Sequence, residues 1–456
     1  MSGRAGALSS GGDPHARVLA LVRAHGWNST SFQVLEPGFR YFFDGDDAAV
    51  AYVETRGAWI AAGAPLCAED RLADVSEAFI TAARRTGRRA CFFSTGARFT
   101  ERVRFEAMRI GEEAFWDPAA WPEILRGSRS LREQLRRARA KGIRVRAVPN
   151  EELGAADSPL RRAATELVDR WLRTRELAPM GFLVQIQPLV LLPEHRLFVA
   201  ERDGELVALL SGAPIWARQG WLLQNLIRSP EAPSGTIELL IDHAMGTATS
   251  EGRHLVTLGL APLSGPVPRA LRVVRKIAGG FYDFEGLRAF KAKLRPTSWS
   301  PLYLSYPGQV GAVRAIADVL GAFARGGLLR FGLRTLLRGP ALVVRLLTIL
   351  LVPWTILLAS VRTDRWFPHP AVKWAWVAFD ALLALGLVAL GRRWNERLAR
   401  LLIAAIGTDA LVTAAEALAW NLPRTTGLGR LALLISVLGP AAATATLWRA
   451  QLRKAN

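Results

Sequence analysis

Two stretches in the second half of the chain mark its fold: LGLAPLSG at Leu258–Gly265 and FEGLRAFKAKL at Phe284–Leu294. The first completes a short apolar run, LVTLGLA, which has the length of a buried strand and closes with turn residues. The second contains three basic residues within six positions, in a chain of 456 residues that has only six lysines. Both belong to a dense set of short motifs between residues 224 and 304.

Outward from these stretches, short apolar runs alternate with helix-period segments over residues 13–306. The expected strands are AAVAYVE, GAWIAAG, RACFFST, LFVAERD, LVALLSGAPIW, GWLLQNLI and LVTLGLA, and the expected helices cover 71–85, 160–175 and 236–250. The pattern predicts an α/β fold with two lobes of similar size, 1–125 and 147–308. Between them, residues 126–146 carry nine basic residues against the single Glu133 and are expected to form a basic joining helix.

The C-terminal third holds four long apolar runs that the first 300 residues lack. Each is long enough to cross about 30 Å of hydrocarbon; they are 339–361, 371–391, 398–420 and 428–448. Seven of the 15 tryptophans lie between Trp354 and Trp448, several at the ends of runs, as in interfacial belts. We therefore expect residues 339–456 to form an α-helical transmembrane domain of about four spans.

Arginine is richest before the first run, between the second and third, and after the fourth. Basic loops face the cytoplasm. We therefore expect a multi-pass protein of the inner membrane whose N-terminal region lies in the cytoplasm. The start, MSGRAGALSSGGDPHARVL, has no apolar segment typical of a signal peptide. Residues 309–338 space their arginines beside an apolar face, which predicts an amphipathic helix in the headgroup layer.

Composition excludes several classes of protein. The net charge is +20 and half of the residues are apolar, which is far too apolar for a disordered tail. Two cysteines, Cys67 and Cys91, rule out a disulfide framework. HExxH, CxxC, P-loop and GxSxG motifs are absent, and the six histidines lack metal-ligand spacing. We expect no metal and no cofactor.

The short motifs resemble the C-terminal catalytic domain (DUF2156) of the bacterial phosphatidylglycerol lysyl- and alanyltransferases. The matching stretches are Asn225–Arg228, Pro233–Glu238, Leu258–Gly265 and Phe281–Leu304, with a further likeness at Met180–Phe182 and in the basic helix. The resemblance implies tandem acetyltransferase-like (GNAT) lobes and transfer of an aminoacyl group from aminoacyl-tRNA to a membrane lipid such as phosphatidylglycerol. Its implied partners are aminoacyl-tRNA and an anionic lipid.

Such a transfer needs cations for phosphates, a deprotonated hydroxyl and donors that stabilise an oxyanion. By resemblance, the catalytic candidates are Arg228, Ser264, Lys291 and Lys293. The substrate-binding candidates are Asn225, Ser234, Gly235, Thr236, Glu238, Glu285 and Arg288, and the tRNA-binding candidates are Arg132, Arg136, Arg137 and Lys141. We expect an extended backbone at Lys291 and Lys293, which would point both ammonium groups into one cleft.

The basic helix has three interpretations that the sequence leaves open: contact with tRNA phosphates, contact with anionic headgroups, or a solvated surface. Its position between the lobes favours tRNA.

Three departures from the family pattern matter. Asn225 stands where the family has Asp, so a neutral donor such as alanyl becomes plausible beside lysyl. Glu238 replaces another Asp. The apolar runs follow the catalytic region, whereas familiar members place their spans before it. The alternatives are an acyl-CoA-dependent N-acyltransferase on the same fold and a non-catalytic lipid- or tRNA-binding membrane protein.

Overall fold

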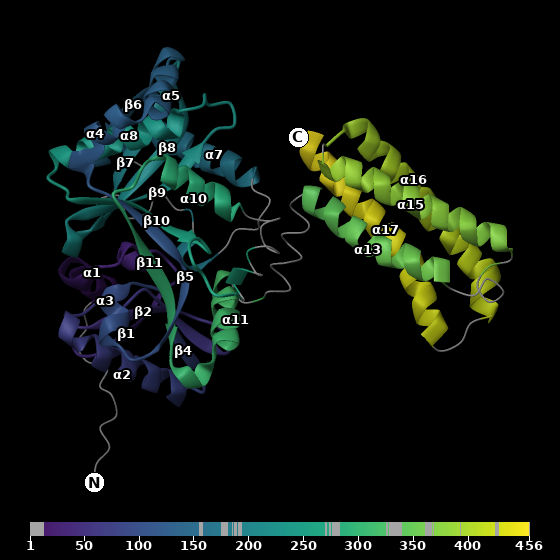
Figure 1. Ribbon diagram of the computed structural model, residues 1–456, viewed down its shortest axis with the longest axis horizontal. Helices are drawn as coiled ribbons and strands as arrows, with labels where there is room; N and C mark the ends of the chain where they lie inside the picture. The colour runs from purple at the N-terminus through teal and green to yellow at the C-terminus, as the bar shows by residue number, and fades with distance from the viewer. Residues whose placement is uncertain are drawn as a thin grey trace, which may run out of the picture. The chain divides into compact units, whose positions relative to one another are not determined.

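The computed structural model describes most of the chain in two compact units (Figure 1). The described residues are 13–154, 158–174, 181–184, 186, 189, 194–269, 271, 272, 275, 283–324, 327, 340–360, 367, 369–392, 394–424 and 428–455. Those up to 327 form an α/β unit, and those from 340 onward form a helical unit. The expected change from α/β to helical structure is confirmed.

One mixed sheet runs through the α/β unit, and its described part has eleven strands in the order β1-β2-β3-β4-β11-β5-β10-β9-β8-β7-β6. The strands are β1 Arg40–Phe43, β2 Ala49–Glu54, β3 Ala58–Ala62, β4 Arg89–Thr95, β5 Glu106–Trp116, β6 Arg144–Val148, β7 Arg196–Arg202, β8 Glu205–Ile215, β9 Gly220–Arg228, β10 Leu255–Pro262 and β11 Ser298–Tyr306. All seven strands expected from the sequence are present.

The last strand of each expected lobe pairs with a strand of the other lobe, which the sequence did not predict. β11 lies between β4 and β5, and β5 in turn pairs with β10. β5 and β11 therefore form the middle of the sheet, as Figure 1 shows. The expected lobe boundaries, 1–125 and 147–308, therefore do not separate the two parts of the sheet. The strand at Ser298–Tyr306 belongs to the expected second lobe but pairs with β4 of the first.

Each half contains one parallel strand pair with a helix in the connection. The helix α2 (Leu72–Arg85) connects β3 to β4, and α8 (Thr236–Ser250) connects β9 to β10. β9 and β10 are paired only at Gly220–Leu222 and Leu255–Thr257. Beyond these residues β10 is paired only with β5, so β9 and β10 diverge at the sequence motifs described above.

The remaining helices of the α/β unit cover the sheet or join its strands. They are α1 Pro14–His25, α3 Ala97–Arg102, α4 Trp121–Gly127, α5 Arg129–Ala140, α6 Asn150–Gly154, α7 Pro159–Arg173, α10 Phe284–Lys293 and α11 Ala312–Phe323. The basic joining helix is shorter than expected: residues 126 and 127 end α4, α5 forms the middle of the segment, and its last part is strand β6.

α11 corrects the interfacial helix expected at 309–338. Its apolar residues Ala315, Val319 and Ala322 are buried in the same core as β3 and β4, so they are not available to lipid. Asp318 of this helix also accepts two hydrogen bonds from Arg89 on β4, at 2.6 and 2.8 Å. Residues 325, 326 and 328–338 of the expected segment lie outside the described residues.

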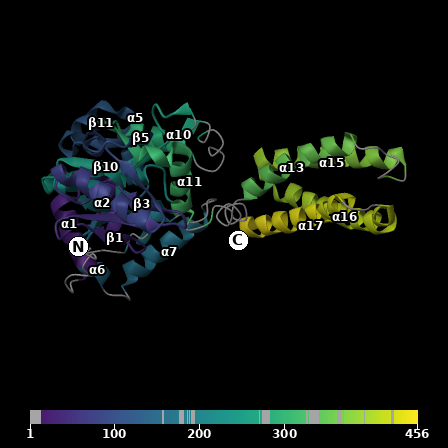
Figure 2. The ribbon, with the colours of Figure 1, turned by 90° about the horizontal axis from the view of Figure 1, so that it is seen from below.

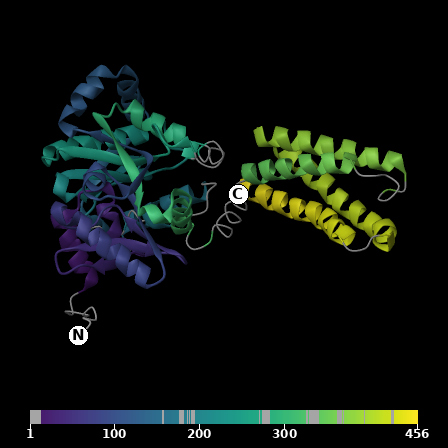
Figure 3. The same ribbon diagram turned by 60° about the horizontal axis from the view of Figure 1, so that its bottom comes forward.

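The helical unit contains α13 Pro340–Ser360, α15 Pro370–Arg392, α16 Glu396–Glu416 and α17 Leu428–Ala455. α13 packs beside α15 and α16 beside α17 (Figures 2 and 3). Their outward side chains include many large apolar ones, such as Ile356, Leu385 and Leu411. Two helical segments of the described residues, Pro370–Gly391 and Glu396–Arg424, are long and apolar enough to cross a membrane.

Candidate functional site

A bulge in β10 accounts for the first half of the LGLAPLSG motif. The register against β5 shifts between Thr257 and Leu260, where Gly259 adopts a φ of +71° that favours glycine. The Gly259 amide donates to the Thr257 hydroxyl at 3.0 Å. The bulge lies beyond the part of β10 that pairs with β9. Its carbonyl groups therefore need hydrogen-bond donors other than those of β9.

The ammonium group of Lys291 donates hydrogen bonds to these carbonyl groups. Its ammonium nitrogen donates to the carbonyl oxygens of Leu258, Gly259 and Leu260 at 2.9, 2.6 and 3.1 Å. The residue is only 2% exposed, and burial lowers the pKa of its ammonium to about 8. An ammonium has three protons, and all three are used here. Lys291 therefore positions the β10 backbone.

The expectation that Lys291 and Lys293 point into one cleft is wrong, because the segment is helical. α10 begins at a capping residue, Asp283, whose carboxylate accepts the Gly286 amide at 2.7 Å. Two positions apart on a helix, side chains diverge by about 200°. Lys293 accordingly turns to α8, where it forms an ion pair with Glu238 at 2.9 Å.

Glu112 on β5 is the centre of a second charged cluster. Its carboxylate accepts from Arg288 at 2.7 Å and from Arg109 at 2.9 Å, and its side chain is buried. The Arg288 guanidinium also lies 4.9 Å from the centre of the Trp299 ring. Arg288 is 44% exposed, so a substrate anion can reach it without unfolding the cluster. Glu285, on the same helix, is exposed.

Glu113 is a buried carboxylate that reasoning from the sequence missed. It is 3% exposed and accepts a hydrogen bond from Thr257 at 2.9 Å. Burial raises the pKa of Glu113, while hydrogen bonds from Ser29 and Thr257 and the charge of Lys291 oppose the rise. The detectable signal was RIGEEAFW at 109–116, two adjacent carboxylates inside an apolar strand.

Ser264 lies in the turn that follows β10. Its hydroxyl donates to the Ala261 carbonyl at 2.7 Å and is buried. Leu263 and Gly265 flank it with φ values of 55° and 70°. A Cβ at Gly265 would lie 2.7 Å from both the Arg109 guanidinium and the Glu112 carboxylate. The second half of LGLAPLSG thus forms a tight turn whose Gly265 packs against Arg109 and Glu112.

Asn225 and Arg228 lie on β9, across the divergence from β10. Asn225 has a φ of 53° at a register shift between β8 and β9, and its amide donates to the Ser211 hydroxyl at 2.9 Å. Arg228 ends the strand and is partly buried. Within the described part of the chain its guanidinium has no hydrogen bond or ion pair, so it is available to an anion.

The segment Ser234–Thr236 begins α8 and packs against the basic helix. Gly235 has a φ of +93°, and a Cβ there would collide with the Gln134 carbonyl oxygen of α5. The Thr236 hydroxyl donates to the Pro233 carbonyl at 2.7 Å, which closes the turn. Glycine is therefore required at 235 for the approach of two helices, whatever else the turn binds.

α5 presents its basic residues to solvent. Leu131, Leu135 and Ala138 are buried, which turns the opposite face outward. Arg132 donates to the Leu125 carbonyl, whereas Arg136 and Arg137 share Glu133. All three arginines and Lys141 are exposed, as a nucleic-acid contact requires.

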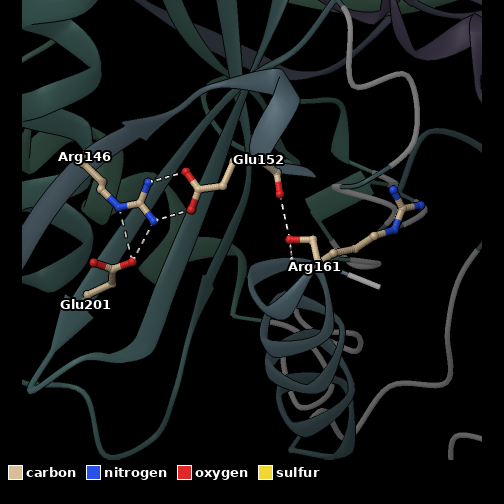
Figure 4. Close-up of polar contacts among 5 residues, drawn as sticks. Arg146, Glu152, Arg161 and Glu201 are labelled. Carbon is tan, nitrogen blue, oxygen red and sulfur yellow. Dashed lines mark hydrogen bonds and ion pairs between the residues drawn. The ribbon is translucent and has the colours of Figure 1, made fainter. Parts of the chain in front are cut away.

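Arg146, from the strand part of the same basic segment, is engaged differently. It donates to both carboxylate oxygens of Glu152, at 2.7 and 2.8 Å, and also to Glu201 (Figure 4). Two carboxylates neutralise it, so it adds little to an anion-binding surface.

The structure thus brings part of the expected site together. Ser264, Arg288 and Lys291 surround the bulge and turn of β10, whereas Lys293 and Glu238 form a separate bridge and Asn225 and Arg228 lie on β9. No group of His, Cys, Asp and Glu among the described residues can hold a metal ion. Met180, Phe281 and Tyr282 of the expected motifs lie outside the described residues.

A family model described as "Phosphatidylglycerol lysyltransferase, C-terminal" matches residues 19–306, which include both motif stretches and the clusters around them. The chain belongs to this family. Curated relatives include the "Lysylphosphatidylglycerol biosynthesis bifunctional protein LysX" of Mycobacterium avium, 28% identical over 243 residues, and its namesake in Nocardia farcinica, 26% identical over 306. These alignments cover 49% and 62% of this chain but only 20% and 26% of the relatives.

Two solved structures match the same region. A DUF2156 C-terminal domain from Agrobacterium fabrum has a TM-score of 0.60 at 24% identity and covers 69% of this chain and 98% of its own. L-PGS from Bacillus licheniformis has a TM-score of 0.58 at 22% identity, with 71% and 98% covered. At these identities the likeness concerns the fold alone. The mixed sheet confirms the α/β fold expected from the sequence, and the tandem GNAT-like lobes stay a prediction.

Proposed function

We propose that this chain is a membrane-anchored aminoacyltransferase that moves an aminoacyl group from aminoacyl-tRNA to a lipid such as phosphatidylglycerol. The observation that carries the proposal is the family match over residues 19–306, with the β10 bulge and its buried Lys291 inside it.

The reaction needs no cofactor. A lipid hydroxyl attacks the ester carbonyl of the aminoacyl-tRNA, a new ester forms, and the terminal ribose oxygen of the tRNA leaves with a proton. Arg228 and Arg288, which are accessible to anions, are assigned to the phosphates of lipid and tRNA. Lys291 and Ser264 are positioning residues that fix the β10 backbone, whose polar groups face the divergence from β9.

The Lys293–Glu238 bridge is assigned to substrate binding, because Lys293 is one-third exposed and Glu238 can exchange this partner for a substrate ammonium. The exposed face of α5 is assigned to the tRNA. Its contacts with the chain's own atoms leave Lys141 and the outer guanidinium groups open to phosphates.

The donor is proposed to be a neutral aminoacyl group. Asn225 uses its amide to bind Ser211, and its uncharged side chain cannot pair with a lysyl ammonium as Asp would. Asn225→Asp should therefore raise the use of lysyl-tRNA relative to alanyl-tRNA. An unchanged ratio would mean that Asn225 does not contact the donor amino acid.

The four helices of the helical unit are proposed to anchor the enzyme in the inner membrane, with the α/β unit in the cytoplasm. Two of them satisfy length and apolarity criteria for spanning helices, and the outward apolar side chains are distributed over all four.

The decisive assay uses the purified full chain, phosphatidylglycerol vesicles and tRNA charged with a labelled amino acid. Transfer of label into the lipid fraction, abolished by ribonuclease, is the expected result. Label transferred only from an acyl-CoA would establish the N-acyltransferase alternative, and no transfer from any donor would leave a binding protein.

A further inference from the structure

The helical unit contains a partly open cavity of about 490 Å³ that no part of the proposed transfer reaction uses. Residues of all four helices line it. Most are apolar, including Leu347 and Leu351 of α13, Leu383 and Leu387 of α15, and Ile406 of α16. Such a volume is in the range of small-molecule binding sites rather than of packing defects.

Three carboxylates line this apolar cavity. Asp380 comes from α15, and Asp409 and Glu416 come from α16. Asp409 accepts a hydrogen bond from Thr413 at 3.0 Å, and one oxygen of Glu416 accepts from the Trp376 indole at 3.1 Å. The other Glu416 oxygen is buried without a partner among the described residues.

Asp380 is the most informative of the three. It is 5% exposed, it lines the cavity, and no described residue donates a hydrogen bond to it or pairs with it. It lies ten residues after the start of α15, about 15 Å along a helix of 23 residues. In a spanning helix this is near the bilayer centre, where an ionisable side chain is costly and marks a functional site.

The missing counter-charge is not supplied by the walls. Among the described residues that line the cavity there is no lysine, arginine or histidine. The carboxylates also do not form a compact metal-binding group within the described part of the chain. Asp409 and Glu416 are two helical turns apart, about 10 Å along α16, so one small ion cannot bridge them.

The cavity is amphipathic along its length. Its polar end holds Trp376 and Glu416, which join α15 to α16, and the backbone immediately after Glu416 forms a π-helical turn at Ala417–Asn421. Such turns often mark functional sites in helices. Further along the same two helices the lining becomes apolar at Leu387 and Ile406. A ligand with an ammonium group and hydrocarbon chains matches this distribution.

We propose that this cavity binds the ammonium-bearing headgroup of an aminoacylated lipid, with its α-ammonium on Asp380 and Asp409. The inference rests on the proposed function, because esterification of a lipid by an amino acid leaves a free α-ammonium on the headgroup. A charge-assisted hydrogen bond to a carboxylate is stronger in apolar surroundings than at the surface. The C-terminal helices would then recognise the product in addition to anchoring the enzyme.

The test supplies the lipid, so it does not depend on synthesis. The purified full chain in phosphatidylcholine nanodiscs is titrated with alanyl-phosphatidylglycerol, and bound lipid is counted by native mass spectrometry. The comparison ligand is the same lipid with its amino group acetylated. We expect the acetylated lipid and the Asp380→Asn variant to bind at least tenfold more weakly. Glu396→Gln, an exposed carboxylate at the start of α16 outside the cavity, should bind as wild type.

A second readout guards against misfolding of the variant. Dicyclohexylcarbodiimide modifies carboxyl groups in apolar surroundings, and alanyl-phosphatidylglycerol should protect Asp380 and Asp409 of the wild-type chain, whereas the acetylated lipid should not. Equal binding of both lipids, or equal protection by both, would overturn the inference. Lipid synthesis without binding would refute the site alone, and binding without synthesis would refute the proposed function alone.

Discussion

At the scale of single residues, the β10 bulge and the turn after it are held by two side chains, Lys291 and Ser264. Lys291 and Ser264 were expected to face substrate, yet both hold backbone carbonyl groups of β10 and its turn. The reason is that a motif shows which residues occur together, whereas their roles depend on a bulge formed by long-range pairing of β10 with β5.

Lys291 and Lys293 offer a matched pair of substitutions. Lys291→Met should lower the free energy of unfolding by about 2–5 kcal/mol, because three buried carbonyl oxygens lose their donor. Lys293→Met removes a partly exposed ion pair and should cost about 1 kcal/mol or less. Denaturant unfolding of the full chain in detergent measures both. Equal losses would show that the carbonyl cluster contributes nothing special.

Glu36 provides a pH test. It is 4% exposed, one of its oxygens has no partner among the described residues, and burial raises its pKa to about 8. The folded protein therefore keeps a proton that the unfolded chain loses near pH 4.5. The stability this gives is complete below pH 4.5 and is lost as the pH rises to 8, by at most about 1.4 kcal/mol per pH unit.

Glu36→Gln stays neutral at every pH, so its melting temperature should exceed that of the wild type increasingly from pH 5 to pH 8. The control is Glu69→Gln, whose wild-type carboxylate has its pKa lowered by Arg102 and Arg98 and is ionised throughout that range. Its difference from the wild type should stay constant. A constant difference for Glu36→Gln as well would mean that Glu36 is not buried.

At the scale of helices and strands, local patterns predicted most elements and missed how they pair. The alternating apolar runs gave seven strands correctly, since each carries its own periodicity. The segment at 106–116 was missed because Glu112 and Glu113 interrupt its apolar character, and their partners, Arg288 and Thr257, are distant in the sequence. The exchange of β5 and β11 between the halves leaves no local signal.

Gly235 tests the contact between α5 and α8. Gly235→Ala places a methyl group on the Gln134 carbonyl at a φ of +93°, so it should destabilise the protein by more than 1 kcal/mol. Gly246→Ala, inside α8 with open space around its Cβ position, should instead stabilise it by about 0.5–1 kcal/mol. Thermal unfolding of the two variants should shift in opposite directions. A shift of both in one direction would contradict this account of the α5–α8 contact.

At the scale of the whole molecule, the order of α/β unit and apolar helices follows from composition alone, whereas the membrane topology follows from charge. The arginine-rich segments around the helical unit predict a cytoplasmic α/β unit, where aminoacyl-tRNA is found. The amphipathic pattern at 309–338 led to the wrong prediction of an interfacial helix, because an apolar helix face can pack in a protein core as well as on a lipid surface. The apolar face of α11 packs in the core.

Cysteine labelling tests this topology. The native Cys67 and Cys91 are buried, so an impermeant maleimide should give little background. If α13, α15 and α16 all span the membrane and the α/β unit is cytoplasmic, Glu396→Cys between α15 and α16 also lies in the cytoplasm and should react only after the cells are permeabilised. Arg424→Cys, at the other end of the α16 segment, should react in intact cells. If α13 also spans, reaction of Glu396→Cys from outside would place the α/β unit away from tRNA and remove the proposed donor. Protection of both until permeabilisation would mean that this helix pair does not cross the bilayer, and the carboxylate-lined cavity would then lie outside the hydrocarbon.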